Sequence, residues 1–289
     1  MTSGRSAARS EVVRRDAGGA RWEVATRAVR GPLAEHVREY VGYREAAAGP
    51  ATRREVSSGR VVVIFDLGPT ILVAGPGAAG ARHRRGFAAG LHDRYALTTH
   101  DGAQEGIQLD LSPIGARLLF GVPLCELTNQ VVGLEHLLPG EPDLIDALRD
   151  DASWDARFDR LDATLGARLA APGLPLRVTA WAVAHIERAR GAIDVRALSV
   201  DAGYSDKQLA RLFREHVGVG PKRFARFVRL QHVLRAADAR PHASWADLAL
   251  AHGYCDQAHL ARDVRDLTGL TPSEYRAERA DVAELFGAP

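Results

Sequence analysis

The chain has 289 residues, of which 46% are hydrophobic and 26% are charged, and its formal net charge is +2 at pH 7. This composition is that of a globular protein, and the length predicts two domains rather than one. No apolar run approaches the roughly 18 residues of a membrane-spanning helix, and the basic N-terminus lacks the apolar core of a secretion signal. We therefore expect a cytoplasmic protein without a membrane partner.

The N-terminal half shows the signals of a β-rich domain. Residues 1–20 are basic and rich in small side chains, and we interpret them as a disordered tail. Between 21 and 140, short β-branched runs such as 61–65 and 71–75 are bounded by Gly and Pro, as strands are. The run 107–113 alternates at period two, which indicates a half-buried strand. Short helices are expected near 33–43 and 114–119, so we predict an α+β, β-rich sensor or dimerisation domain.

A helical connector is expected to follow at 141–171. Apolar residues recur there every three or four positions, and eight acidic residues between Glu141 and Asp162 are interpreted as its solvent face. Pro172, Gly173 and Pro175 then interrupt the helical pattern. We therefore place a linker at 172–176, followed by an all-α domain at 177–280.

The all-α part contains an internal repeat. Residues 202–224 align with 252–275 after a one-residue insertion, so that Gly203-Tyr204 falls on Gly253-Tyr254. In each copy a short helix reaches the turn glycine, and a second helix runs from a capping Asp to a terminating Gly. The predicted second helices are 206–217, capped by Asp206, and one that Asp256 caps and that ends before Gly269. Two such helix-turn-helix units indicate a reader of double-stranded DNA.

The second helix of each unit combines an apolar stripe with an outward face of hydrogen-bond donors. Arg can bind guanine O6 and N7, Gln can bind adenine, and Ala leaves room for a thymine methyl group. Helix N-termini and basic side chains can hold phosphates. We expect base contacts from Lys207, Gln208, Ala210, Arg211, Gln257, Ala258, Ala261 and Arg262, and phosphate contacts from Arg214, Lys222, Arg223, Ser244 and Arg265.

The charge distribution agrees with this interpretation. Residues 177–280 hold 17 Arg and Lys against 12 Asp and Glu, whereas the remaining residues hold 21 against 24. Phosphate binding requires the positive charge to lie in the half that carries the repeat. An ordinary solvent-exposed helical surface would give the same excess of basic residues, so the prediction of DNA binding depends on the repeat.

The stretch GYCDQAHLARDVRDLTGLTPSEYR is similar to the signature of the AraC/XylS family of bacterial transcription regulators, and GYSDKQLARLFREHVGVGPKRF fits that family's first unit. The resemblance covers 177–279 and implies a seven-helix domain whose third and sixth helices enter successive major grooves. It places Lys207, Ala210, Arg211, Gln257, Ala258 and Arg262 at bases. Lys207 stands where some relatives have an aromatic residue, so base preference is not carried over. Residues 109–138 resemble a sensor-like domain of one subgroup, and such domains often bind an effector or dimerise through a cupin-like fold.

The alternative is a cupin-like enzyme or a small-molecule-binding module fused to a DNA reader. His83, His92, His100 and Glu105 could suggest a cupin metal site, but the closely spaced His-x-His pair of such sites is absent. We therefore expect no metal, no cofactor and no enzymatic activity. A small-molecule effector, RNA polymerase and a second copy of the chain stay open as partners, as does the choice between activation and repression.

The two cysteines lie in different predicted domains, so no disulfide is expected. Cys125 is expected to be a small apolar core residue. Cys255 is expected in the accessible turn before the sixth helix.

Overall fold

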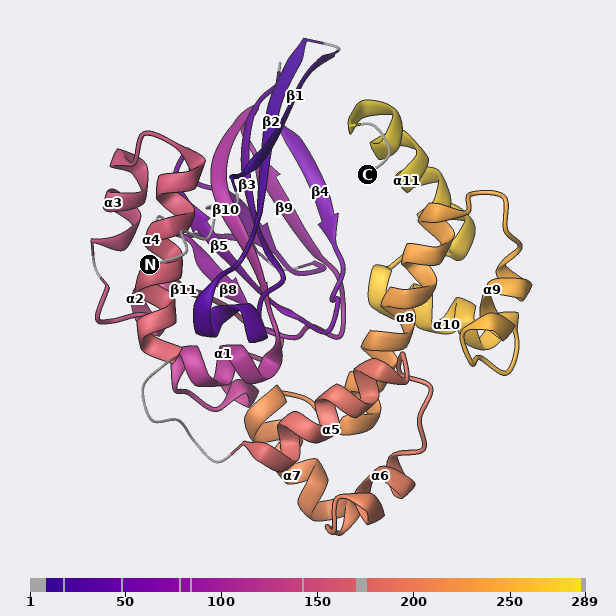
Figure 1. The fold of residues 1–289 in the computed structure, drawn as a ribbon. Coiled ribbons are helices and arrows are strands. Elements are labelled where there is room, and N and C mark those ends of the chain that lie inside the picture. The colour runs from indigo at the N-terminus through magenta and orange to yellow at the C-terminus, as the bar shows by residue number, and fades with distance from the viewer. Residues whose placement is uncertain are drawn as a thin grey trace, which may run out of the picture.

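The computed structural model describes residues 9–17, 19–47, 49–77, 79–83, 85–141, 143–169 and 176–286. Two β-sheets flanked by helices form the N-terminal part, and a group of helices forms the C-terminal part (Figure 1). Over these described ranges, no helix combines the length and apolarity needed to cross a membrane.

A seven-stranded antiparallel sheet has the order β1-β2-β3-β10-β5-β8-β11, and a four-stranded sheet has the order β4-β9-β6-β7. The strands are β1 (Glu11–Ala17), β2 (Ala20–Ala28), β3 (Glu39–Ala46), β4 (Ala51–Glu55), β5 (Val61–Asp66), β6 (Leu72–Ala74), β7 (Ala81–Arg82), β8 (Phe87–Ala89), β9 (Ala96–His100), β10 (Ala103–Leu111) and β11 (Val131–Gly133). The central strand β10 alternates buried and exposed residues, as its period-two sequence predicts. Its register pairs Leu109 with Tyr40 on one side and with Val63 on the other.

Helices cover one face of the larger sheet. They are η1 (Gly31–Glu35), α1 (Pro113–Phe120), η2 (Leu124–Glu126), α2 (Leu134–Leu137), α3 (Leu144–Asp150) and α4 (Trp154–Leu169). Buried residues of α3 and α4, such as Leu148 and Phe158, belong to the same core cluster as Tyr40 and Leu109 of the sheet. The segment that we expected to be a separate connector is therefore part of the first domain, because its apolar stripe is buried against this sheet.

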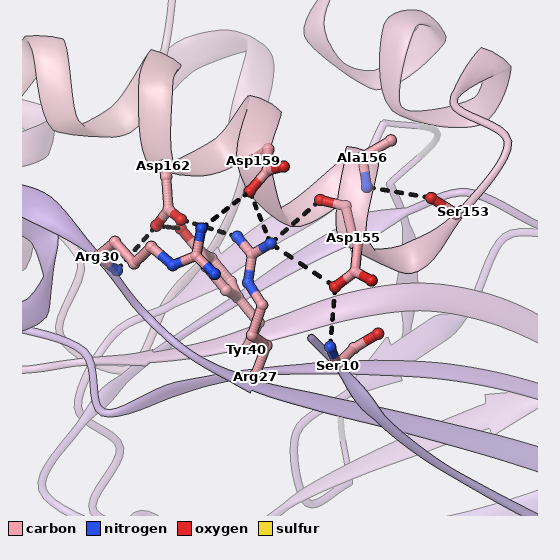
Figure 2. Close-up of polar contacts among 9 residues, drawn as sticks. All are labelled: Ser10, Arg27, Arg30, Tyr40, Ser153, Asp155, Ala156, Asp159 and Asp162. Carbon is pink, nitrogen blue, oxygen red and sulfur yellow. Dashed lines mark hydrogen bonds and ion pairs between the residues drawn. The ribbon is translucent and has the colours of Figure 1, made fainter. Parts of the chain in front are cut away.

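A buried arginine fixes α4 to the sheet (Figure 2). The side chain of Arg27 on β2 is 1% exposed and lies 2.7 Å from carboxylate oxygens of both Asp159 and Asp162. Tyr40 donates a hydrogen bond of 2.8 Å to Asp162, and the backbone N–H of Ser10 donates one of 2.8 Å to Asp155. Of the acidic residues that we assigned to the solvent face, Asp162 thus turns toward the sheet, where it helps to neutralise a buried guanidinium. Asp155 and Asp159 contact the same arginine, but their side chains are still exposed to solvent, as expected.

Two other expectations for the N-terminal domain are wrong. Glu11–Ala17 of the expected disordered tail is strand β1, which pairs with β2 across a turn where Gly19 has φ of +79°. The expected helix at 33–43 is a short 3-10 turn followed by β3, because β3 is held between β2 and β10. Both strands depend on pairing with distant residues, which local sequence does not display. The helix expected at 114–119 is confirmed as α1.

The C-terminal domain has seven helices within the described residues: α5 (Arg177–Arg188), α6 (Val195–Asp201), α7 (Asp206–Val217), α8 (Pro221–Ala239), α9 (Trp245–Ala251), α10 (Gln257–Thr268) and α11 (Pro272–Phe286). Phe213, Phe224, Phe227 and Leu260 are fully buried in its core. The expected linker at 172–176 lies outside the described residues, except for Leu176, which precedes α5.

Candidate DNA-binding interface

The two halves of the sequence repeat fold into two similar helix-turn-helix units. Each unit begins with a seven-residue helix, α6 or α9, and ends with a twelve-residue helix, α7 or α10. The turn glycines have φ of +73° at Gly203 and +75° at Gly253, where a side chain would be strained. Equivalent backbone bonds of 3.0 Å close both turns, from Tyr204 N–H to the Ser199 carbonyl and from Tyr254 N–H to the Ala249 carbonyl.

The turns differ in how the second helix starts. Asp256 caps α10 as predicted, and its carboxylate accepts the His259 N–H at 2.6 Å. The cap of α7 is Ser205 rather than the predicted Asp206, because Ser205 and Gln208 form a reciprocal capping box. Asp206 is instead the first helical residue, where its charge still favours the helix N-terminus. The helices end at Gly218 and Gly269, both with positive φ.

The outward faces of α7 and α10 carry the predicted base-contacting residues. Lys207, Gln208 and Arg211 are exposed on α7, and Gln257, Ala258 and Arg262 are exposed on α10. Ala210 and Ala261, each followed by Arg, are half-buried. The amide oxygen of Gln208 accepts the Ser205 N–H at 3.0 Å, and Arg211 lies 3.8 Å from Glu215. Both helices thus present solvent-facing donors beside a small alanine.

The predicted phosphate-contacting residues divide into two groups. Arg214 and Lys222 are exposed at the end of α7 and the start of α8. Ser244 is the N-cap of α9, where its hydroxyl accepts the Asp247 N–H at 3.1 Å. Arg223 and Arg265 instead line a cavity between the two domains.

A polar network holds α10 against the long helix α8. The carboxylate of Asp263, which is buried, accepts a hydrogen bond of 2.8 Å from Arg226 and one of 3.1 Å from the Tyr254 hydroxyl. Arg226 also donates to Asp266 at 2.5 Å. The Arg229 guanidinium lies 4.7 Å from the centre of the Tyr254 ring. The second unit is therefore oriented by charged hydrogen bonds as well as by apolar packing.

In the first unit a buried histidine links α7 to α5. His216 Nδ1 lies 2.9 Å from the Thr179 hydroxyl. Burial lowers the pKa of His216, while nearby Glu215 raises it and Arg117 lowers it. Desolvation therefore favours the neutral imidazole at the end of this helix.

The first unit also packs on the N-terminal domain. The Thr128 hydroxyl donates a hydrogen bond of 2.8 Å to the Gly218 carbonyl, beyond the end of α7. Leu91 and Ile114 of the first domain belong to the core cluster of the second. The two domains thus share buried apolar surface at this point.

Arg54 of β4 makes the corresponding contact with the second unit. Its guanidinium donates a hydrogen bond of 3.0 Å to the carbonyl of Thr268, the last residue of α10. It also lies 3.3 Å from Glu278 and 4.1 Å from the centre of the Tyr95 ring. A cation at this helix end is stabilised by the helix dipole.

The cavity between the domains has a volume of about 420 Å³ and is rich in arginine. Arg223, Arg226 and Arg265 of the C-terminal domain face Asp93, Arg94 and Tyr95 of the other domain across it. Arg223 forms an ion pair of 3.4 Å with Asp93. Arg223, which we predicted to contact a DNA phosphate, is therefore paired with a carboxylate of the first domain in this structure.

A second cavity, of about 200 Å³, lies between the two sheets of the N-terminal domain. Its apolar wall includes Ile64, Val73 and Phe87, and its polar groups include Arg53 and Glu55. The buried Ser57 hydroxyl makes no hydrogen bond within the described residues. Mostly apolar cavities with a few converging polar groups are typical of small-molecule sites.

The residues considered for a metal site do not converge. His92 lies 2.7 Å from the Gly90 carbonyl. His100 is buried, and its ring lies 3.8 Å from the Glu45 carboxylate. Glu105 forms ion pairs with Arg44 and Arg157. His83 lies beside Phe87. Over the described ranges, no three His, Cys, Asp or Glu side chains are grouped so that they could hold a metal.

Both cysteines are free thiols and both are exposed. Cys255 lies in the turn before α10, as expected. The expectation of a core position for Cys125 is wrong, because its 3-10 turn directs Leu124 inward and Cys125 outward.

Sequence reasoning missed the residues that join the domains, Arg54, Asp93 and Thr128. They are polar residues of strands and loops that stand among other polar residues, and the hydrogen bonds of Arg54 and Thr128 join positions up to 224 and 90 residues apart in the chain. A single sequence contains no signal for such pairs.

Comparisons with known proteins agree with the repeat. Residues 198–278 match a family model described as a helix-turn-helix domain. The chain is 30% identical over 92 residues to an uncharacterized HTH-type transcriptional regulator of Staphylococcus aureus, which is 32% of this chain and 12% of that protein. It is 29% identical over 208 residues to the HTH-type transcriptional regulator GlxA of Rhizobium meliloti, covering 65% of this chain and 61% of the relative. The chain thus spans about an eighth of the first relative's length.

Among solved structures, the chain is similar to a transcriptional regulator with an AraC-type DNA-binding domain from Chromobacterium violaceum. The two share 26% identity with a TM-score of 0.33, over 36% of this chain and 93% of the other.

Proposed function

We propose that this chain is an AraC-type helix-turn-helix transcriptional regulator, which binds a specific DNA site through both of its units and so controls transcription. One observation carries the proposal: a single chain holds two units of the same helix lengths, each with an exposed row of donors on its second helix. These rows include Lys207 and Arg211 on α7, and Gln257 and Arg262 on α10. Such side chains can read base edges in the major groove.

The helix between the units fits a reader of one DNA face. Helix α8 has 19 residues, which corresponds to a length of about 28 Å at 1.5 Å per residue. Successive major grooves on one face of B-DNA are about 34 Å apart. A rigid helix of this length can separate two recognition helices by a comparable distance.

Selection of bound duplexes from a random pool tests this proposal with the full chain. We expect two conserved elements about one helical turn apart. Arg262→Ala should weaken binding by about 1–3 kcal/mol and relax specificity at one base pair. Arg235→Ala, which removes an exposed arginine of α8 outside the predicted contacts, is the matched control. Equal binding of the two variants would show that α10 does not read bases.

We further propose that the N-terminal domain controls DNA binding through a small-molecule effector. The cavity between the sheets supports this, and β4 connects it to the DNA-binding domain. Arg53 and Glu55 line the cavity, while the intervening Arg54 bonds to the end of α10. Since successive side chains of a strand point to opposite faces, movement of β4 at the cavity would move Arg54.

The effector proposal has its own test. Duplex selection is repeated with a small-molecule extract of bacterial cells, and DNA affinity with and without extract is compared. Ala89→Phe, which fills part of the cavity, should abolish any change in affinity without altering binding in buffer. A change that persists in this variant would rule out the cavity as the effector site. Stoichiometric metal bound by the protein would instead favour a cupin-like enzyme fused to a DNA reader.

A further inference from the structure

Strand β1 forms an open edge of the larger sheet. The strand order begins at β1, so only β2 pairs with it among the described strands. Its hairpin with β2 reaches beyond the other strands at the top of Figure 1. An edge strand carries backbone N–H and C=O groups that can pair with another strand. At the opposite edge β11 has only three residues, whereas β1 has seven.

On the face of β1 that points away from the core, a valine lies between an acidic and a basic residue. Val12 packs against the core, so Glu11, Val13 and Arg15 lie on the other face of the strand. All three are exposed, and Val13 is one of the few large hydrophobic residues at the surface, at 46% exposure. Its neighbour across β2 is Val24, which is half-buried.

This sequence is complementary to itself in the antiparallel direction. If two β1 strands pair with Val13 opposite Val13, Glu11 of each strand lies opposite Arg15 of the other. The two-fold symmetry gives two such ion pairs, one on each side of a central apolar pair. Charges on an edge strand usually keep edges apart, but here their order makes the edges attract.

We propose that two copies of this chain associate through β1 to form a two-fold symmetric dimer with a continuous antiparallel sheet. The register has Val13 on the dyad and Glu11 paired with Arg15. The second copy is the occupant, because the complementary set of charges is that of the strand itself. The dimer carries two double helix-turn-helix domains. This inference is independent of the proposed DNA binding.

Charge reversal at the two positions tests the register. The full chain is studied by sedimentation velocity over a range of concentrations. Glu11→Arg places Arg opposite Arg15 twice in the dimer, and Arg15→Glu places Glu opposite Glu11 twice. Each variant should raise the dimer dissociation constant by about tenfold or more. An equimolar mixture of the two variants, and the double variant E11R/R15E, should both recover dimers.

Arg21→Glu is the control, because Arg21 is exposed on β2 of the same hairpin but away from the outer edge. It should dimerise like the natural sequence, and circular dichroism should show that all variants keep their fold. A monomeric natural chain would overturn the proposal. So would dimers that are insensitive to either single reversal, or a mixture that does not recover them.

Discussion

Equivalent tyrosines in the two units, Tyr204 and Tyr254, allow a test of how helix α10 is held in place. Tyr254 is 3% exposed and donates its hydroxyl proton to Asp263 at 3.1 Å, whereas Tyr204 at the same position of the first unit is 37% exposed. A hydrogen bond to a charged group is worth about 1.5–3 kcal/mol. Asp263 keeps its bond from Arg226 when the hydroxyl is removed, so we expect the lower limit. Tyr254→Phe should destabilise the second unit by about 1.5 kcal/mol, and Tyr204→Phe by less than about 0.5 kcal/mol.

A larger loss is expected when the carboxylate itself is removed. Asp263→Ala breaks the bonds from both Arg226 and Tyr254 and leaves the tyrosine hydroxyl buried without its acceptor. Arg226 retains its bond to Asp266, so its charge is not left unpaired. The expected cost is about 3 kcal/mol, since two charged hydrogen bonds are lost.

Amide hydrogen exchange measured by mass spectrometry reports the opening free energy of each unit separately. Peptides from α9 and α10 should lose protection in Tyr254→Phe and more strongly in Asp263→Ala, while peptides from α6 and α7 stay unchanged. If Tyr254→Phe and Tyr204→Phe gave the same protection in their respective units, the network would not be what orients α10.

Three further outcomes follow from the domain contacts and from one buried acid. Arg54→Ala removes the hydrogen bond to the Thr268 carbonyl and should weaken the contact between the two domains by about 2 kcal/mol. Small-angle scattering should then give a larger radius of gyration. An unchanged radius of gyration would show that Arg54 does not hold the domains together. Gly218→Ala should lower the Tm by several degrees, because φ is +95° and a Cβ would lie 2.8 Å from the Thr128 hydroxyl; an unchanged Tm would exclude this strain. Burial raises the pKa of Asp66 from 3.8 to about 6, so the folded state binds the extra proton and its stability falls as pH rises from about 4 to 6. Asp66→Asn should lack this fall, and an identical pH profile in both proteins would refute the assignment.

In the C-terminal domain, much of the fold could be predicted from sequence because its signals are local. Turn glycines, caps and apolar stripes lie within a few residues of each other, and they set where α7, α9 and α10 begin and end. The one wrong cap, Asp206 in place of Ser205, differs by a single position because both side chains can accept from the first helical turn. Exposure of the predicted base-contacting residues follows from the same stripes.

The N-terminal domain was less predictable because its strands are defined by partners far away. Strands β1 and β3 have polar or mixed local sequences, and only pairing with β2 and β10 makes them strands. The acidic residues of α4 suggested a solvent face, yet Asp162 turns toward Arg27, which lies 135 positions earlier. The charge of a side chain does not indicate whether a buried residue of opposite charge will lie beside it in the folded protein.

By itself, the sequence determined that this protein carries two helix-turn-helix units and which of their side chains face outward, since helix periodicity and capping act over a few residues. Only the tertiary structure decided how those units contact the first domain: Arg54 bonds to the last residue of α10, Thr128 bonds to Gly218 just beyond α7, and Asp93 pairs with Arg223. These contacts join residues that are distant in the chain, and three-dimensional packing alone brings them together.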